Sequence, residues 1–179
     1  MFTIENSVLV IVDVQGKLAQ LMYQKDALFE NLQKIIRGAQ ILQVPILWVE
    51  QNPKGLGPTI PEVAELLRDI EPISKLSFSC CANERFMQRL EALGHRQALL
   101  AGIETHICVH QTAMDLLQLG YEVQIVTDAV SSRTVENKQI GLEKIRAAGG
   151  VLTSVETALF ELLRVAKGPK FKELLALVK

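Results

Sequence analysis

The sequence predicts an α/β fold, a three-layer α/β/α sandwich in which helices cover both faces of a parallel sheet. Short apolar runs rich in Val and Ile alternate along the chain with segments that carry apolar residues at helical spacing. The first run, SVLVIV at Ser7–Val12, is almost wholly apolar, which is typical of a strand buried on both faces. Parallel neighbours need crossover connections, and the intervening helices supply them.

Five further runs are expected to be strands because they are apolar or extended and are bounded by polar residues, Gly or Pro. They are Val44–Val49, a brief piece at Pro72–Leu76, Gln97–Ala101, Glu122–Thr127 and Val151–Thr153. Pro45 stands near the start of its run, where a missing N–H is tolerated. The segment Gln51–Thr59 holds two prolines and two glycines in nine residues and is therefore expected to be a loop.

The expected helices combine an apolar stripe with a start or stop signal. They are Asp26–Gln43, Pro61–Arg68, Asn83–Leu93, His106–Leu119, Val135–Ala148, Glu156–Val165 and a tail helix after Pro169. Pro61 suits a first helical position, and Gly94 and Gly120 are typical of helix ends.

Composition limits the class of protein. The 179 residues suit one domain, 1–179, and the apolar (49%) and charged (22%) fractions are those of an ordinary globular protein. The net charge of −1, without blocks of like charge, argues against nucleic-acid and membrane-surface partners. No run is long enough to span a bilayer, and no signal peptide is visible. Three cysteines make no disulfide framework, so we expect a reduced, cytoplasmic protein.

Three polar residues lie where such sheets bind ligands, near the carboxyl ends of strands. Asp13 follows the first strand, Lys75 lies on or beside the short third one, and Cys108 follows the strand that runs into Gly102. Together they form a coherent nucleophilic site. Asp13 is suited to take the thiol proton, while Lys75 and a helix N-terminus favour the thiolate.

Each of these residues also has a plainer interpretation. An Asp that closes a buried strand often accepts backbone N–H groups, a single Lys near a strand end is usually solvated, and a free Cys is usually a small buried hydrophobe. Position alone leaves both interpretations open.

Other chemistry is less well supported. His106 and His110 are four residues apart on an expected helix, but no third metal ligand accompanies them at a recognisable spacing. The vicinal pair Cys80-Cys81 is expected to be two ordinary thiols. The first strand is followed by VDVQGKL, which lacks a Gly-rich phosphate fingerprint, and no GxSxG elbow occurs.

Three stretches, VLVIVDVQGKL, SKLSFSCC and AGIETHICVHQTAMDLLQLGYEVQIVTDAVSSR, resemble the isochorismatase-like family of cysteine hydrolases. The resemblance runs over nearly the whole chain in order, and the Gly-x-x-Thr-x-x-Cys-Val stretch is its most specific part. The segments EQNPKGLGPT and GPKFKELLALV are similar to the small isochorismatase-domain-containing branch, whose members mostly have unassigned substrates.

This resemblance implies a six-stranded parallel sheet and a catalytic triad at Asp13, Lys75 and Cys108. In the family's amidases the cysteine attacks an amide carbonyl to give a thioester that water hydrolyses. The Asp relays protons, and the Lys stabilises charge. The resemblance also implies an oxyanion hole from the backbone N–H groups of Glu104 and Cys108, with a cis bond between Ile103 and Glu104.

Two departures from the family's patterns bear on the substrate. The family's nicotinamidases carry an Asp/His metal cluster after the second strand, but that region here reads WVEQNPKGLGPT and contains no His. We therefore expect no metal and no other cofactor. True isochorismatases generally lack the cysteine, because cleavage of an enol ether needs acid catalysis. The presence of Cys108 favours a small amide or related C–N bond, with an enol-ether hydrolase as the alternative and a partner-binding protein with a vestigial site as the second.

The remaining expectations concern the substrate pocket and assembly. Loop position suggests that a small-molecule substrate contacts five side chains, which are Gln15, Trp48, Gln51, Leu56 and Phe78. We also expect a homo-oligomer, a dimer or larger. The tail Phe171–Val178 carries an apolar stripe, and Tyr121 and neighbouring side chains point away from the sheet, so both need cover.

Overall fold

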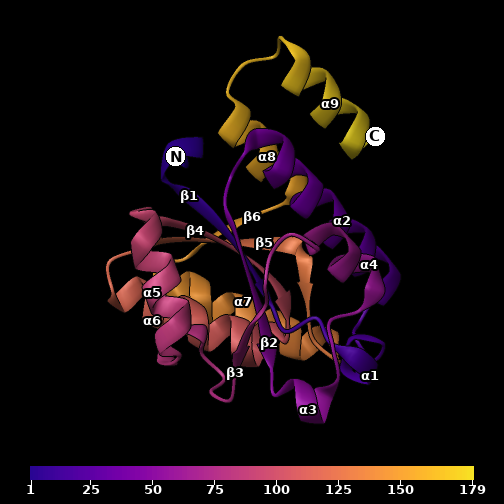
Figure 1. Ribbon diagram of the computed structural model, residues 1–179, viewed down its shortest axis with the longest axis vertical. Helices are drawn as coiled ribbons and strands as arrows, with labels where there is room; N and C mark the ends of the chain where they lie inside the picture. Colours follow the sequence, from indigo (N-terminus) through magenta and orange to yellow (C-terminus); the bar gives the residue numbers. More distant parts are fainter.

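The computed structural model describes residues 1–179 and contains one six-stranded parallel sheet in the order β3-β2-β1-β4-β5-β6 (Figure 1). The strands are β1 (Ser7–Val12), β2 (Ile46–Gln51), β3 (Ile73–Lys75), β4 (Gln97–Ile103), β5 (Glu122–Ser131) and β6 (Val151–Thr153). Strand order reverses at β1, which pairs with both β2 and β4. The predicted α/β class and the six parallel strands are confirmed.

Nine α-helices and several short turns connect the strands. The helices are α1 (Gly16–Ala19), α2 (Lys25–Leu42), α3 (Pro53–Leu56), α4 (Pro61–Ala64), α5 (Glu84–Leu93), α6 (His110–Gln118), α7 (Val135–Ala147), α8 (Val155–Leu163) and α9 (Pro169–Val178). Three 3-10 turns lie at Ile4–Asn6, Glu65–Leu67 and Cys80–Ala82, and one π-helical turn spans Thr105–Val109. No helix is both long enough and apolar enough to cross a lipid bilayer.

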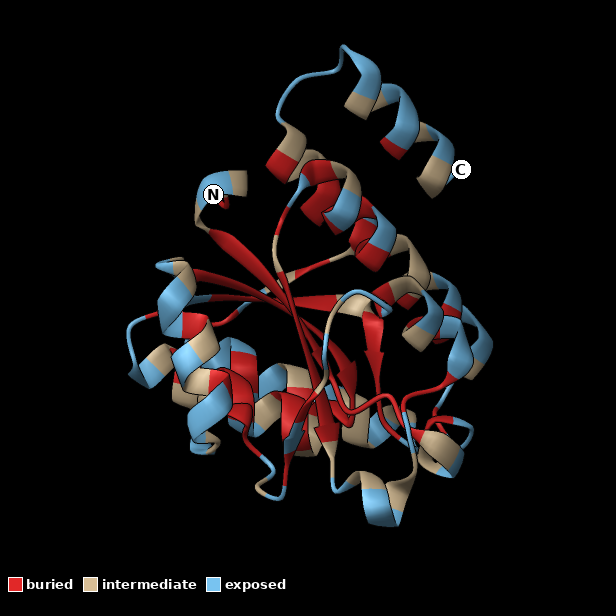
Figure 2. Cartoon of the chain, in the orientation of Figure 1, coloured by how far each residue is buried: buried red, intermediate tan, exposed pale blue.

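The sheet separates two apolar cores, one on each face. Along β1, Leu9 and Ile11 belong to the core beneath α2, α8 and α9, whereas Val8, Val10 and Val12 belong to the core beneath α5, α6 and α7. Side chains alternate between the faces of a strand, so a strand covered on both sides must be apolar at every position. The strands are accordingly the most continuously buried part of the chain (Figure 2).

Apart from shifts of one or two residues at the ends of other elements, four expected elements differ from the structure in detail. The loop 51–59 contains the single turn α3, and the expected helix Pro61–Arg68 is α4 followed by a 3-10 turn. The expected helix from His106 begins as the π-helical turn and becomes α-helical only at His110. Strand β5 runs on to Ser131, with a register shift against β4 that inserts extra residues. Local signals predict the type of these elements but not the tertiary contacts that set their ends.

The tail helix α9 packs on its own domain, so the expectation that its stripe needs another copy is wrong. Leu174 is fully buried in the core beneath α2, and the Phe171 ring lies 6.2 Å from that of Phe160 on α8. Tyr121 is likewise buried, with the Arg96 guanidinium 5.0 Å from the centre of its ring. Leu174 is covered within one chain, because α8 and α9 fold back across α2 (Figure 1), whereas Phe171 and two further stripe residues, Leu175 and Val178, are only half-buried.

Candidate active site

The candidate active site lies at the carboxyl ends of the central strands, where strand order reverses. Asp13 directly follows β1, Lys75 is the last residue of β3, and Cys108 lies in the π-helical turn after β4. Parallel strands end at one edge of the sheet, and helices that leave in opposite directions from β1 and β4 open a crevice there. The structure therefore brings together three residues that span 95 positions of the chain, from Asp13 to Cys108.

Asp13 and Lys75 form a buried ion pair. The Lys75 Nζ lies 2.7 Å from Asp13 Oδ2, and the two side chains are 0% and 3% exposed. The same ammonium donates to Gln51 Oε1 at 2.7 Å and to the carbonyl oxygens of Ser77 and Phe78 at 3.0 and 2.9 Å. A buried charge is tolerated only when it is paired and hydrogen-bonded, and these four acceptors meet that condition. The plain interpretation of Lys75 as a solvated surface residue does not hold.

The backbone around the site depends on two glycines. Gly102 has φ +121°, and a Cβ there would overlap the carbonyl of Val12 on the neighbouring β1, so β4 approaches β1 closely at this point. Gly141 on α7 faces the backbone of Thr105 and His106, where a Cβ would be too close. The absence of a side chain at Gly141 lets α7 support the turn that carries Cys108.

The Cys108 thiol and the Asp13 carboxylate lie close enough for each to shift the pKa of the other. Burial raises the pKa of Asp13 above its ordinary value, although Lys75 and, to a smaller degree, Cys108 oppose the shift. Burial and the nearby Asp13 carboxylate also raise the pKa of Cys108, and Lys75 offsets only part of that. The direction of this shift is opposite to the one that the helix N-terminus and Lys75 suggest from the sequence, because burial favours the neutral thiol of Cys108.

The backbone N–H of Glu104 is available as a hydrogen-bond donor at this turn. The Ile103–Glu104 peptide bond is cis, as the resemblance implies, and the Glu104 N–H has no hydrogen-bond partner within the protein. The Glu104 side chain is held elsewhere, because its carboxylate accepts from the Arg133 guanidinium at 3.0 Å. The Glu104 carbonyl oxygen accepts from the N–H groups of Ile107 and Val109, which fixes the π-helical turn. A free N–H beside a nucleophile is what a developing oxyanion needs.

A small pocket of about 90 Å³ opens onto these groups. Its lining is mostly apolar and comprises Asp13, Leu18, Gln51, Leu56, Phe78, Ile103, Glu104, Ile107 and Cys108. Three of the five residues expected to contact the substrate, Gln51, Leu56 and Phe78, are among them.

Gln15 and Trp48 do not line this pocket, and both position the loop after β2 instead. The Gln15 amide donates to the carbonyl oxygens of Gln51 and Gly57 at 3.0 and 2.7 Å and accepts from the Gln51 N–H at 2.6 Å. The Trp48 indole is buried in the core and donates to Thr59 Oγ1 at 2.9 Å. Loop position suggested a role in binding for both, but their polar atoms are already used by the backbone and by Thr59.

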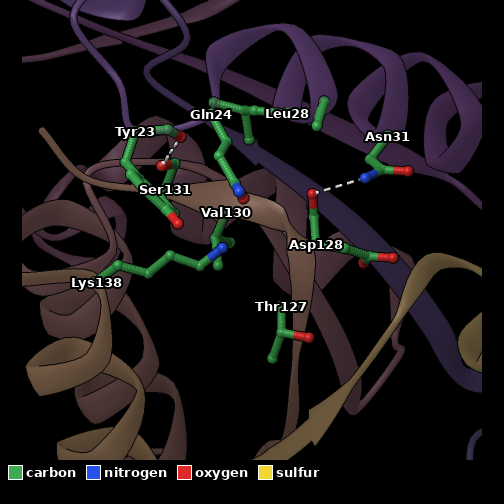
Figure 3. Close-up of a pocket in the computed structure, with 10 residues that line it drawn as sticks. Tyr23, Gln24, Leu28, Asn31, Thr127, Asp128, Val130, Ser131 and Lys138 are labelled. Atoms are coloured by element: carbon green, nitrogen blue, oxygen red, sulfur yellow. Dashed lines mark hydrogen bonds between the residues drawn. The ribbon is translucent and has the colours of Figure 1, made fainter. Parts of the chain in front are cut away.

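A larger pocket of about 290 Å³ lies elsewhere, between α2, α7 and the end of β5 (Figure 3). Its walls carry Lys138 and Asp128, along with Asn31, Tyr23 and Ser131. The two pockets share no lining residue, and Cys108 lines only the smaller one.

The remaining candidates do not assemble into a second reactive centre. His106 Nδ1 lies 2.9 Å from Ser132 Oγ, and no group of three or more His, Cys, Asp or Glu side chains is arranged to hold a metal ion. Burial raises the pKa of Cys80 and of Cys81 to about 12. Neither thiol lines the small pocket.

Sequence reasoning missed three residues that position the site. Arg133 neutralises Glu104, Glu50 accepts from the N–H and the hydroxyl of Thr59 at 2.7 Å each, and Gly141 seats the π-helical turn. Glu50 carried one available signal, because a carboxylate at the end of an apolar strand needs a partner. Nothing local marks Arg133 or Gly141, since their partners are about 30 residues away in the chain.

Comparisons with known proteins agree with this architecture. The family model described as "Isochorismatase domain" matches residues 7–157. The chain is 38% identical over 178 residues to the "Secreted isochorismatase effector Isc1" of Phytophthora sojae, with 97% of this chain and 85% of the relative covered. It is 38% identical to "Isochorismatase domain-containing protein 2" of Danio rerio, with coverages of 95% and 85%.

A solved structure shows that the chain also shares its fold with a known protein. The structure described as "MAR1 Ribonuclease from Caenorhabditis elegans" superimposes with a TM-score of 0.92 at 35% identity, covering 99% of this chain and 91% of that one. The family match covers most of the chain, and the relatives and the solved structure agree with it. This chain belongs to the isochorismatase family, whose members are hydrolases.

Proposed function

We propose that the protein is a metal-independent cysteine hydrolase that cleaves a small amide or a related C–N bond through a thioester on Cys108. The observation that carries the proposal is the chain of contacts from Lys75 to Asp13 and from Asp13 to the Cys108 thiol, at the edge of a small pocket. A nucleophile in contact with a base that a third group orients is the general signature of covalent catalysis.

The proposed reaction begins with transfer of the thiol proton to Asp13. As the S–H bond breaks, the sulfur bonds to the amide carbonyl carbon, and the carbonyl oxygen becomes an oxyanion beside the backbone N–H groups of Glu104 and Cys108. Asp13 then returns the proton to the nitrogen, the C–N bond breaks, and ammonia or an amine leaves. A raised pKa suits Asp13 to carry a proton between these steps, because a general acid–base group works best near the operating pH.

Hydrolysis of the thioester completes the cycle. Water gives one proton to Asp13 as its oxygen bonds to the acyl carbon, and the C–S bond breaks. The thiolate takes back the proton, which regenerates the Cys108 thiol and releases a carboxylic acid. Lys75 keeps the Asp13 carboxylate in place, because its ammonium is itself fixed by Gln51 and by the carbonyl oxygens of Ser77 and Phe78.

The alternative of an enol-ether hydrolase is less well supported by the pocket. A substrate of the isochorismate type carries carboxylates, and no cationic side chain lines the pocket. Lys75, behind Asp13, already has four acceptors. A vestigial site is disfavoured by the buried ion pair. Replacing such a pair by apolar residues is often neutral or stabilising, so a chain that did not use the pair would have little reason to keep it. A nucleic-acid substrate is disfavoured by the net charge of −1, although one relative is described as a ribonuclease.

The direct test is a panel of small amides with ammonia release as the readout and the covalent intermediate as a second one. We expect release by the wild-type protein and a mass increase on Cys108 when the reaction is quenched. Activity is expected to survive treatment with EDTA, because no metal-binding cluster is present near the site. Loss of activity on chelation, restored by zinc or iron, would contradict the metal-independent mechanism.

We propose that the protein is cytoplasmic and forms a homo-oligomer through apolar side chains near the pocket mouth. Leu76 is 80% exposed and Phe78 54%, which is unusual for apolar residues so close together. The three cysteines are free, as a reducing compartment requires. Light scattering at micromolar concentration tests the assembly, and a mass near 19.9 kDa would refute it. Cell fractionation tests the location.

A further inference from the structure

We infer that the pocket selects a small, uncharged primary amide with a short apolar acyl group, and that it rejects anionic substrates. This inference rests on the proposed cysteine hydrolysis, but it concerns what the pocket admits. It follows from three features of the lining: which polar atoms are already paired, which are free, and how little apolar volume remains.

The charged and amide groups of the pocket are almost all paired within the protein. Gln51 accepts from Lys75 at 2.7 Å and donates to the Leu76 carbonyl at 2.8 Å, so both ends of its amide are engaged. The Glu104 carboxylate is neutralised by Arg133. No unpaired cation lines the pocket. A substrate carboxylate would therefore lose its hydration and gain no counter-charge, which is strongly unfavourable.

Two polar groups at the pocket remain unpaired by conventional hydrogen bonds within the protein. Asp13 Oδ1 is buried without such a partner and faces only the weak thiol donor of Cys108. The Glu104 N–H has no acceptor. One free acceptor and one free donor match the NH₂ and the C=O of a primary carboxamide. This match also places the carbonyl carbon near the Cys108 sulfur, since Asp13, Glu104 and Cys108 line the same pocket.

The rest of the lining limits the size of the acyl group. The volume of about 90 Å³ is less than a third of the 290 Å³ of the pocket beside Lys138. Leu56 and Phe78 are the apolar residues contributed by the loops after β2 and β3, and Phe78 is 54% exposed. Because its ring is partly in solvent, truncation at Phe78 enlarges the pocket without opening a core cavity.

The first test does not depend on turnover. Iodoacetamide and iodoacetate are similar in size and react alike, with an S–C bond forming as iodide leaves, but only iodoacetate is anionic. Relative to free glutathione, we expect Cys108 to prefer iodoacetamide by at least about tenfold, because the pocket does not compensate a carboxylate. Labelling is followed by peptide mass spectrometry, with Cys81 as the internal reference. Equal preference at Cys108 and in glutathione would overturn the inference.

The second test uses a series of amides of increasing acyl length, with Phe78→Ala and the matched control Ile140→Ala. Ile140 is 51% exposed on α7 and does not line the pocket. We expect kcat/KM to fall as the acyl group lengthens, Phe78→Ala to shift the optimum to longer groups, and Ile140→Ala to leave it unchanged. Faster turnover of amides that carry a carboxylate would overturn the inference while leaving the cysteine mechanism intact. If no amide is cleaved while Cys108 still discriminates between the reagents, the proposed hydrolysis fails and the pocket's selectivity stands.

Discussion

The two pockets at the strand ends of this protein differ in size, polarity and chemistry. The pocket at Asp13 and Cys108 holds about 90 Å³ and is mostly apolar, whereas the pocket beside Lys138 holds about 290 Å³ and is lined largely by polar side chains. Behind the small pocket, the ammonium of Lys75 has four acceptors. In the large one, Lys138 has neither an ion pair nor a hydrogen bond from its side chain and extends towards Val130 and Gln24 (Figure 3).

The polar groups of the larger pocket mainly join secondary-structure elements. Asn31 on α2 donates to the Asp128 carbonyl at 3.1 Å, and Ser131 donates to the Tyr23 carbonyl at 2.7 Å (Figure 3). The Asp128 carboxylate accepts from the Val155 N–H at 2.9 Å. These bonds tie α2, β5 and α8 together. Under the proposed mechanism, the volume of a pocket does not locate the chemistry in this fold. A thiol beside a paired carboxylate, at the point where strand order reverses, is the better guide.

The largest expected effect is the loss of the nucleophile from the small pocket. Cys108→Ala is expected to lower amide turnover by on the order of 10⁴ or more, since no other group lining the pocket forms a thioester. Cys81→Ala is the matched control, because its thiol lies outside the pocket, and it should retain activity. Turnover is measured per folded molecule, with folding checked by circular dichroism. Residual activity of Cys108→Ala near that of the wild type would refute the mechanism.

The second prediction concerns Asp13, the proposed general base. Asp13→Asn is expected to keep the fold and to lower turnover by on the order of 10²–10⁴, the usual contribution of a general base. Because the working form is the carboxylate and its pKa is raised by burial, wild-type activity should fall as the pH drops towards that pKa, at a pH above the ordinary value of 3.8. A pH–rate profile measures this acidic limb. If Asp13→Asn unfolds while activity per folded molecule is unchanged, the role of Asp13 is structural.

The third prediction concerns the contribution of the Lys75 ammonium to the free energy of unfolding. Lys75→Met leaves the Asp13 carboxylate buried without its partner, and breaking such a pair costs about 3–5 kcal/mol of the free energy of unfolding at neutral pH. The deficit should shrink as the pH falls through the raised pKa of Asp13, because the neutral carboxyl tolerates burial. Urea unfolding at several pH values measures it. A pH-independent deficit would show that lost packing, and not the unpaired charge, is responsible.

The smallest effect is expected at the larger pocket. Lys138→Met removes an ammonium that has no partner within the protein, so turnover of the best amide should change by less than about twofold. Burial lowers the pKa of Lys138, so its removal should not destabilise the fold. The same kinetic assay and the same urea unfolding measure both quantities. A large loss of activity would mean that the two pockets are coupled.

Several features of this protein were predictable from its sequence because they follow from local rules. Continuous apolar runs give doubly covered strands, as in β1, and stripes ended by Gly or opened by Asn give helices, as in α5. The strand-end rule alone ranked Asp13, Lys75 and Cys108 above other polar residues. Family resemblance added the cis bond at Glu104, which no local rule predicts, since such bonds are very rare outside proline.

The tertiary structure alone decided which groups are paired and which stay free. Gln15 and Trp48 were expected at the substrate, but backbone groups of a distant loop and Thr59 occupy their polar atoms. The tail helix was expected to seek a partner, but Leu174 packs beneath α2. Burial and Asp13 raise the pKa of Cys108, where sequence position suggested the opposite direction. Burial, pairing and pKa depend on contacts between residues far apart in the chain, and such contacts exist only in the folded protein.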